Sequence, residues 1–185
     1  MSVVTGNLWK LYFMPEQENQ TKKLVDDNIL LLNQLAQFVQ EQASQIYSLP
    51  NEQLQSGSIG AHVRHIIDHY LSVLVDGGVV NYDQRERDAN IEINATYAGD
   101  ILNALCSELS DLSKSDSVKV VISTNVEGPS STVDSAYDRE LCFLHSHTTH
   151  HMAIIRLLAI HNNIVLPCYF GKAASTQKFE KNVQF

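Results

Sequence analysis

Histidines at helical spacing are the residues of this sequence best suited to chemistry. Residues 147–151 read His-Thr-Thr-His-His, and a second group, His62, His65 and His69, lies upstream. Because residues four apart share one face of an α-helix, His147 and His151 can direct two imidazoles at one metal ion. Seven of the eight histidines fall within residues 62–69 and 145–151. The spacing therefore predicts a metal site to which two helices contribute.

The spacing leaves the third ligand open. Two histidines seldom complete a site, and the upstream helix offers His62, His65 and His69 along one rim of its apolar face. His150 lies at the flank of the downstream stripe, where it is a candidate for substrate contact or a surface residue. The alternative is that the imidazoles are core and rim residues joined by hydrogen bonds. The downstream pair lacks the intervening Glu of the H-E-x-x-H motif, so protease-type hydrolysis is not predicted.

The composition favours one domain with no nucleic-acid-binding surface. A chain of 185 residues is long enough for a single core, and a net charge of -8 opposes contact with phosphates. The three cysteines are widely spaced without a C-x-x-C pattern, so neither disulfides nor a thiolate zinc site is predicted. No run of apolar residues is long enough to span a membrane. We expect a cytoplasmic protein with no membrane partner and one domain over residues 1–185.

Apolar periodicity predicts four long helices around these histidines. They cover residues 16–47, 59–75, 97–113 and 136–162, with Asp134 or Ser135 as the cap of the last helix. Between the third and fourth helices, β-branched residues at 117–123 and 130–133 predict a small β-hairpin or irregular insertion. We expect the tail, residues 163–185, to be irregular. The fold class that follows is all-α, a four-helix bundle with its helical core at residues 16–162.

Two segments resemble the paired motifs of the DinB/YfiT-like superfamily. The first is Ser-Ile-Gly-Ala-His-Val-Arg-His-Ile at residues 58–66, and the second is Ser-His-Thr-Thr-His-His at residues 146–151. The motifs occur in the expected order, and the resemblance spans most of residues 16–162. The R-G-Q segment that usually follows the second motif is replaced here by Met152-Ala153-Ile154. That departure leaves the histidines in place but weakens any function carried over from closer relatives.

The resemblance implies a DinB-like bundle and a specific set of metal ligands. Carried over by position, the metal triad is His65, His147 and His151, which leaves His62 and His69 outside it. Three neutral imidazoles leave positions for water or substrate, as in catalytic sites. The expected cofactor is one divalent ion, Zn or Ni first, with Fe, Mn and Co also compatible.

Two reactions on a small-molecule substrate fit such an ion. In thiol (S-) transfer, which superfamily members perform, the metal holds a low-molecular-weight thiol as thiolate for attack on an electrophile. In hydrolysis, a water activated by the metal attacks an amide or ester. Hydrolysis needs a proton shuttle, for which His69 and Glu140 are the candidates. We therefore favour thiol transfer slightly.

Two arginines follow the predicted second helix closely. Arg85 and Arg87 are candidates for binding a substrate carboxylate, although a charged run of this kind is more often a solvated loop.

A function of another class also fits the sequence. The chain can be a metal-stabilised binding or interaction module without turnover, which a fourth protein ligand such as His62 or His69 would favour. Apolar residues beside the main stripe of the first helix, such as Leu30 and Leu31, suggest a homodimer.

Overall fold

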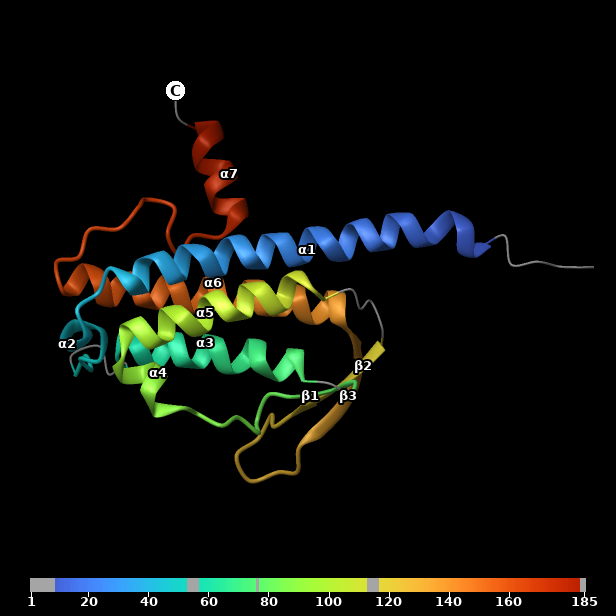
Figure 1. Cartoon of the computed structure of the whole chain (residues 1–185), viewed down its shortest axis with the longest axis horizontal. Coiled ribbons are helices and arrows are strands. Elements are labelled where there is room, and N and C mark those ends of the chain that lie inside the picture. Colours follow the sequence, from blue (N-terminus) through green and yellow to red (C-terminus); the bar gives the residue numbers. More distant parts are fainter. Residues whose placement is uncertain (1–8, 53–56, 76, 113–116, 184–185) are drawn as a thin grey trace, which may run out of the picture.

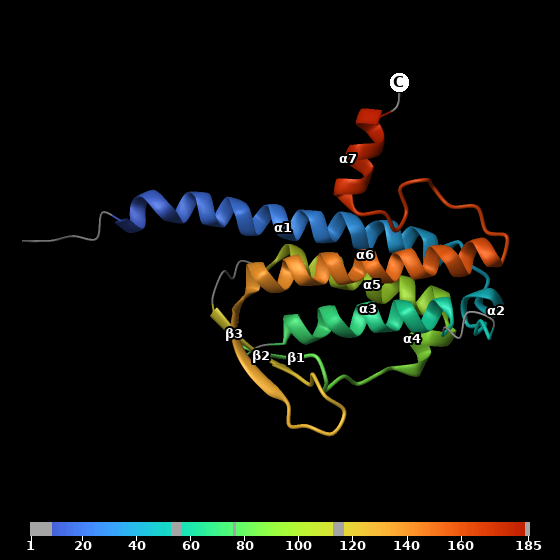
Figure 2. The ribbon, with the colours of Figure 1, turned by 180° about the vertical axis from the view of Figure 1, so that it is seen from behind.

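Helices make up most of this protein, and a small sheet lies at one end of them (Figure 1). The computed structural model describes residues 9–52, 57–75, 77–112 and 117–183, with side chains from Gln20 onward. None of the helices in that part of the chain has the length and hydrophobicity that a membrane span requires. Four long helices lie side by side in both views (Figure 2): α1 (Trp9–Gln40), α3 (Ile59–Leu74), α5 (Ala95–Ser110) and α6 (Tyr137–His161).

Helix α3 begins where the sequence predicts, because a serine caps it. Ser58 Oγ accepts a hydrogen bond from the backbone N–H of Ala61 at 3.0 Å, which satisfies one of the free donors of the first turn. Gly60 lies so close to the short helix α4 (Ala89–Ile93) that a Cβ there would clash with the carbonyl oxygen of Glu92. The glycine of the first motif therefore lets α4 pack directly on α3.

The four long helices enclose one core. Leu32, Leu35, Ile66, Leu102 and Leu144 are among its members, each with 0% of its surface exposed. Burying side chains of this size stabilises the fold by about 1.5–3 kcal/mol each relative to leaving them in water. Helices α3 and α6 pack against each other within this arrangement, which brings the two histidine segments together.

The expected β-hairpin forms, and a third strand joins it to make a three-stranded sheet. Strands β2 (Ser117–Ile122) and β3 (Ser131–Ala136) form an antiparallel pair, as the sequence predicts. The third strand, β1 (Val79–Asn81), pairs in parallel with β2 in the register Val80 to Val120. Gly77 and Gly78, with φ of 118° and 69°, turn the chain from α3 into β1 through the left-handed region that glycine adopts without strain.

The first helix, the tail and the cap of α6 also differ from the sequence prediction. The first helix begins at Trp9 and ends at Gln40 instead of covering residues 16–47, and a separate turn, α2 (Ser44–Tyr47), follows it. The tail is not wholly irregular, because α7 (Ala174–Val183) forms there and stands away from the other helices (Figure 1). The cap of α6 is Ala136 without a side-chain hydrogen bond, since Ser135 donates to Glu140 Oε1 at 2.5 Å instead.

Candidate metal centre

Four imidazoles from α3 and α6 meet between these two helices. We call His65 and His69 of α3 and His147 and His151 of α6 the histidine cluster. One nitrogen from each of His65, His69 and His147 lies within 4.8 Å of the others. A tetrahedral zinc site has Zn–N bonds of about 2.0–2.1 Å, which sets its nitrogens roughly 3.4 Å apart. Small side-chain movements are therefore sufficient for these three residues to bind one ion.

His151 belongs to the same cluster but has a different nearest partner. Its ring centroid lies 4.5 Å from that of His65 and 4.5 Å from that of His147. Its Nδ1 is 3.0 Å from Nδ1 of His62, so one of these two nitrogens donates to the other. His150, the flanking residue, is exposed and its ring centroid is 5.2 Å from that of His151. The structure thus brings the predicted triad together and adds His69 to it.

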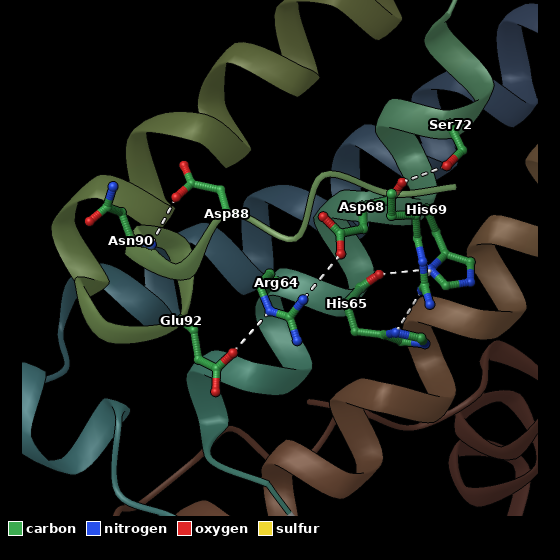
Figure 3. A network of polar contacts seen from close by, with 9 residues as sticks. Arg64, His65, Asp68, His69, Ser72, Asp88, Asn90 and Glu92 are labelled. Atoms are coloured by element: carbon green, nitrogen blue, oxygen red, sulfur yellow. Dashed lines mark hydrogen bonds and ion pairs between the residues drawn. The ribbon is translucent and has the colours of Figure 1, made fainter. Parts of the chain in front are cut away.

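The hydrogen bonds of His69 prepare one of its nitrogens for a metal. His69 Nδ1 lies 2.8 Å from the carbonyl oxygen of His65, an acceptor, so Nδ1 carries the proton and donates it (Figure 3). The lone pair of the neutral ring is then on Nε2. Histidines that bind metals usually donate their second nitrogen to a carbonyl or carboxylate in this way. The resemblance to the superfamily placed His69 outside the ligand triad, whereas the spacing left it as a candidate. Its hydrogen bonding makes it a suitable ligand.

His147 contains a buried nitrogen without a partner. Within the described part of the chain, its Nε2 is buried and makes no hydrogen bond. A buried polar atom left unpaired costs about 1–3 kcal/mol, and native proteins contain few of them. In the tautomer with the proton on Nδ1, a metal ion would satisfy the lone pair of Nε2, so the donor set of the cluster fits a divalent cation.

Burial keeps these imidazoles neutral. Burial, and after it the charges of neighbouring imidazoles, lower the pKa of His65 to about 3 and that of His151 to about 3. The same two causes lower the pKa of His147 to about 4. The pKa of His69 is lowered by burial too, against the effect of its hydrogen bond to the His65 carbonyl. At neutral pH the cluster therefore presents uncharged nitrogens, the form in which histidine binds metals.

Arg85 reaches the cluster, whereas Arg87 does not. Arg85 Nη1 lies 3.0 Å from His65 Nδ1 and 3.3 Å from His69 Nδ1. Arg87 is exposed, at a backbone φ of 54°. Of the two arginines that the sequence offers as substrate ligands, the structure places Arg85 in contact with the predicted metal site.

An ion-pair network supports α3 beside the cluster (Figure 3). Arg64 Nε lies 3.0 Å from Glu92 Oε2, and Arg64 Nη1 lies 3.5 Å from Asp68 Oδ2. Asp68 is only 4% exposed, and burial raises its pKa against the opposing effect of Arg64. This network joins α3 to α4 on the side of α3 next to His65 and His69.

Two aromatic residues that the sequence analysis did not single out border the cluster. The Tyr82 ring lies 5.3 Å from that of His69, and the Phe143 ring lies 5.4 Å from that of His147, between centroids. Both also line a pocket of about 300 Å³ beside the sheet. Phe143 precedes His147 by four residues, so helical spacing was a signal for it. Tyr82 lies in a loop, where no local pattern points to the site.

Glu140 lies in the wall of the same pocket and is 2% exposed. Its carboxylate accepts hydrogen bonds from Tyr82 Oη at 2.6 Å and from Ser135 Oγ at 2.5 Å. No hydrogen bond or ion pair joins it to a histidine of the cluster in the described residues. Its predicted role as a proton shuttle would therefore have to pass through Tyr82.

Comparison with known proteins adds little to this geometry. No family model matches the chain, and no solved structure matches it. One similar protein is FK506-binding protein 5 of Rhizopus delemar, 29% identical over 102 residues. That alignment covers 53% of this chain and 26% of the length of the fungal protein. The aligned part of the chain thus spans about a quarter of that relative's length.

Proposed function

We propose that this chain is a DinB-like four-helix bundle protein that binds one divalent metal ion, Zn or Ni first, and acts as a metal-dependent enzyme. The observation that supports this most is the convergence of neutral imidazoles from α3 and α6 around the buried, unpaired Nε2 of His147. When bound, the ion would supply Lewis acidity that lowers the pKa of a coordinated thiol or water.

The proposed ligands are His65, His147 and His151, the set implied by the resemblance to the superfamily. His65 and His147 also belong to the set grouped most closely in space, whose third member is His69. The two sets of ligands assign different roles to His69. In the first it stays next to the ion as a proton carrier, and in the second it is a ligand.

Thiol transfer is the reaction we favour. None of the four histidines of the cluster forms a hydrogen bond or ion pair with a carboxylate in the described residues, and Glu140 is already bonded to Tyr82 and Ser135. Hydrolysis would therefore depend on His69 for proton transfer, whereas a thiolate held by the ion needs no such base. The proposed substrates are a low-molecular-weight thiol and a small electrophile.

Metal content measured by plasma mass spectrometry tests the proposal. Protein without an affinity tag should hold about one equivalent, and His65→Ala and His147→Ala should each lose it. His69→Ala and His151→Ala, measured in parallel, identify the third ligand as the variant that loses metal. His161→Ala is the matched control, because His161 is exposed at the end of α6. Wild-type protein that stays free of metal after incubation with zinc, nickel or manganese would refute the proposal.

The position of His69 favours a second candidate function, a metal-stabilised binding module. If His69 and His151 both bind the ion with His65 and His147, four protein ligands close its coordination shell. Loss of metal in all four variants, with no thiol binding, would support this module in place of the enzyme.

We further propose that the protein is cytoplasmic and forms a homodimer through α1. Leu30 is 61% exposed on this helix, which provides apolar surface for a second copy. Light scattering after size-exclusion chromatography tests this, with Leu30→Glu expected to yield monomer.

A further inference from the structure

The guanidinium of Arg85 has fewer partners than its half-buried position requires. Its Nη1 is near His65 and His69, but its Nε is buried and has no hydrogen-bond partner in the described part of the chain. No described hydrogen bond involves Nη2 either. Nε and Nη2 together form the side-on edge of the guanidinium, which matches the two oxygens of a carboxylate.

One of the two Nη1 contacts is not a hydrogen bond. His69 Nδ1 donates to the His65 carbonyl at 2.8 Å, so it has no lone pair to accept from Arg85 at 3.3 Å. His65 Nδ1, at 3.0 Å, is then the acceptor of Nη1. The one described hydrogen bond that Arg85 donates is therefore accepted by the lone pair of His65, a proposed metal ligand.

That lone pair is lost when His65 binds a metal ion. A neutral imidazole has one lone-pair nitrogen and one N–H. If Nε2 binds the metal, Nδ1 carries the proton, and if Nδ1 binds the metal, its lone pair is used. In both cases Arg85 loses its acceptor, and a guanidinium without an acceptor remains next to the ion.

No carboxylate of the described chain takes the place of this acceptor. Asp68 lies 3.5 Å from Arg64 Nη1, and no hydrogen bond joins Asp68 to Arg85. Asp83 is exposed and likewise forms none with Arg85. Burial lowers the pKa of Arg85, and the charges of both carboxylates oppose this effect.

We infer that Arg85 binds the carboxylate of a small molecule that coordinates the metal ion, so the site selects thiols or electrophiles that carry a carboxylate. The inference rests on the proposed function, because it assumes a metal ion held by His65. To the proposed function it adds the class of ligand, a molecule with a carboxylate. The preference for this class is assigned to the Nε–Nη2 edge of Arg85.

Cobalt(II)-loaded protein provides the test. Mercaptoacetate and its neutral isostere mercaptoacetamide are titrated separately, and the cobalt–thiolate absorption gives the ratio of their affinities. Replacing Arg85 with Met should lower this ratio about tenfold, as expected for one lost charge-assisted pair. Comparing the same two thiols in each variant cancels their different thiol acidities. Arg87→Met, an exposed arginine of the same loop, should keep the wild-type ratio.

The cobalt content separates the two proposals. If both wild type and Arg85→Met bind cobalt and show the same ratio of affinities for the two thiols, the inference is overturned and the proposed metal site is not. If Arg85→Met and Arg87→Met lower this ratio equally, the inference is also overturned, because the effect is then a general one of charge.

Protein that binds no cobalt refutes the proposed function and, with it, the coordination of the small molecule to a metal ion. The remaining part of the inference, that Arg85 binds a carboxylate, is then decided on the metal-free chain. The Nε–H signal of Arg85, assigned in NMR spectra by its absence in Arg85→Met, should shift saturably on titration with acetate and not with chloride. A signal that acetate leaves unmoved overturns the inference.

Discussion

Two sets of polar side chains lie next to each other along α3 and α6 and differ in how completely they are hydrogen-bonded. We call Asn28, Tyr70 and Thr148 the Asn28 network. Tyr70 Oη donates to Asn28 Oδ1 at 2.6 Å, and Thr148 Oγ1 donates to Tyr70 Oη at 3.3 Å. Asn28 Nδ2 donates to the carbonyl oxygens of Leu24 at 2.8 Å and Leu141 at 3.2 Å.

On α3 and on α6, a residue of the histidine cluster is next in sequence to a residue of the Asn28 network. Tyr70 follows His69, and Thr148 follows His147. Yet His147 Nε2 and the neighbouring Arg85 Nε are buried without partners in the described residues. A paired buried network stabilises and orients its helices, whereas unpaired groups cost stability unless a ligand binds them. The contrast supports our proposal that the histidine cluster binds a ligand, whereas the paired Asn28 network stabilises the packing of the helices.

The largest expected effect is stabilisation by metal. A ligand that binds the folded chain alone stabilises it by about 4 kcal/mol at a free concentration a thousand times its Kd. Urea unfolding with and without zinc should show a stabilisation of this order in wild type and none in His147→Ala. His161→Ala should behave like wild type. Equal stabilisation of His147→Ala would show that the ion binds elsewhere.

Asn28→Ala should have the next largest effect, without metal. It removes the acceptor of Tyr70 Oη and the donor to two carbonyl oxygens, so it should destabilise the chain by roughly 2–3 kcal/mol. Asn33→Ala, at an exposed position of the same helix, is the control and should change stability by about 0.5 kcal/mol or less. Urea unfolding of metal-free protein measures both. Similar changes in the free energy of unfolding for the two variants would show that the Asn28 network does not stabilise the fold.

The dependence of stability on pH should come from the cluster. Unfolded histidine titrates near pH 6.5, whereas folded His65 and His151 titrate near 3. Between these values the unfolded chain binds more protons, so stability is full above pH 6.5 and falls as the pH drops toward 3. Burial raises the pKa of Tyr70 far above neutrality, so the Asn28 network contributes no such dependence.

Unfolding midpoints in urea, measured on metal-free protein from about pH 7.5 to about pH 5, test whether stability falls as the pH decreases. The midpoint should decrease with pH in wild type, and its slope should be smaller in His65→Gln, which removes one titrating group. A midpoint that stays constant over this range would contradict the lowered histidine pKa values.

The sequence predicted local features better than distant contacts. Helices α3 and α6 were predicted to within one residue at each end, because periodicity and the Ser58 cap are local signals. Strand β1 has three residues and forms by pairing with β2 about forty residues later, which no local pattern specifies. Helix α7 has no buried residue, so the tail lacked an apolar stripe to reveal it.

The site shows the same division. Spacing on each helix predicted that His147 and His151 meet one histidine of the upstream helix, and the resemblance to the superfamily selected His65 for that role. The position of Arg85 depends on the loop after β1, and no local pattern specifies its contact with His65. The bond of His69 to the carbonyl of His65 is local, because the two residues are four apart on α3, but the resemblance had left His69 outside the triad.

The smallest expected effect is that of Thr148→Val. The lost hydroxyl makes one long hydrogen bond, of 3.3 Å, so the variant should be destabilised by about 1 kcal/mol or less. Thr149→Val, whose hydroxyl bonds the carbonyl of His145 within the same helix, is the control. Metal content should equal that of wild type in both, because the Thr148 hydroxyl points to Tyr70 and not to the cluster. Loss of metal in Thr148→Val alone would show that the Asn28 network positions His147, and that the two groups work as one.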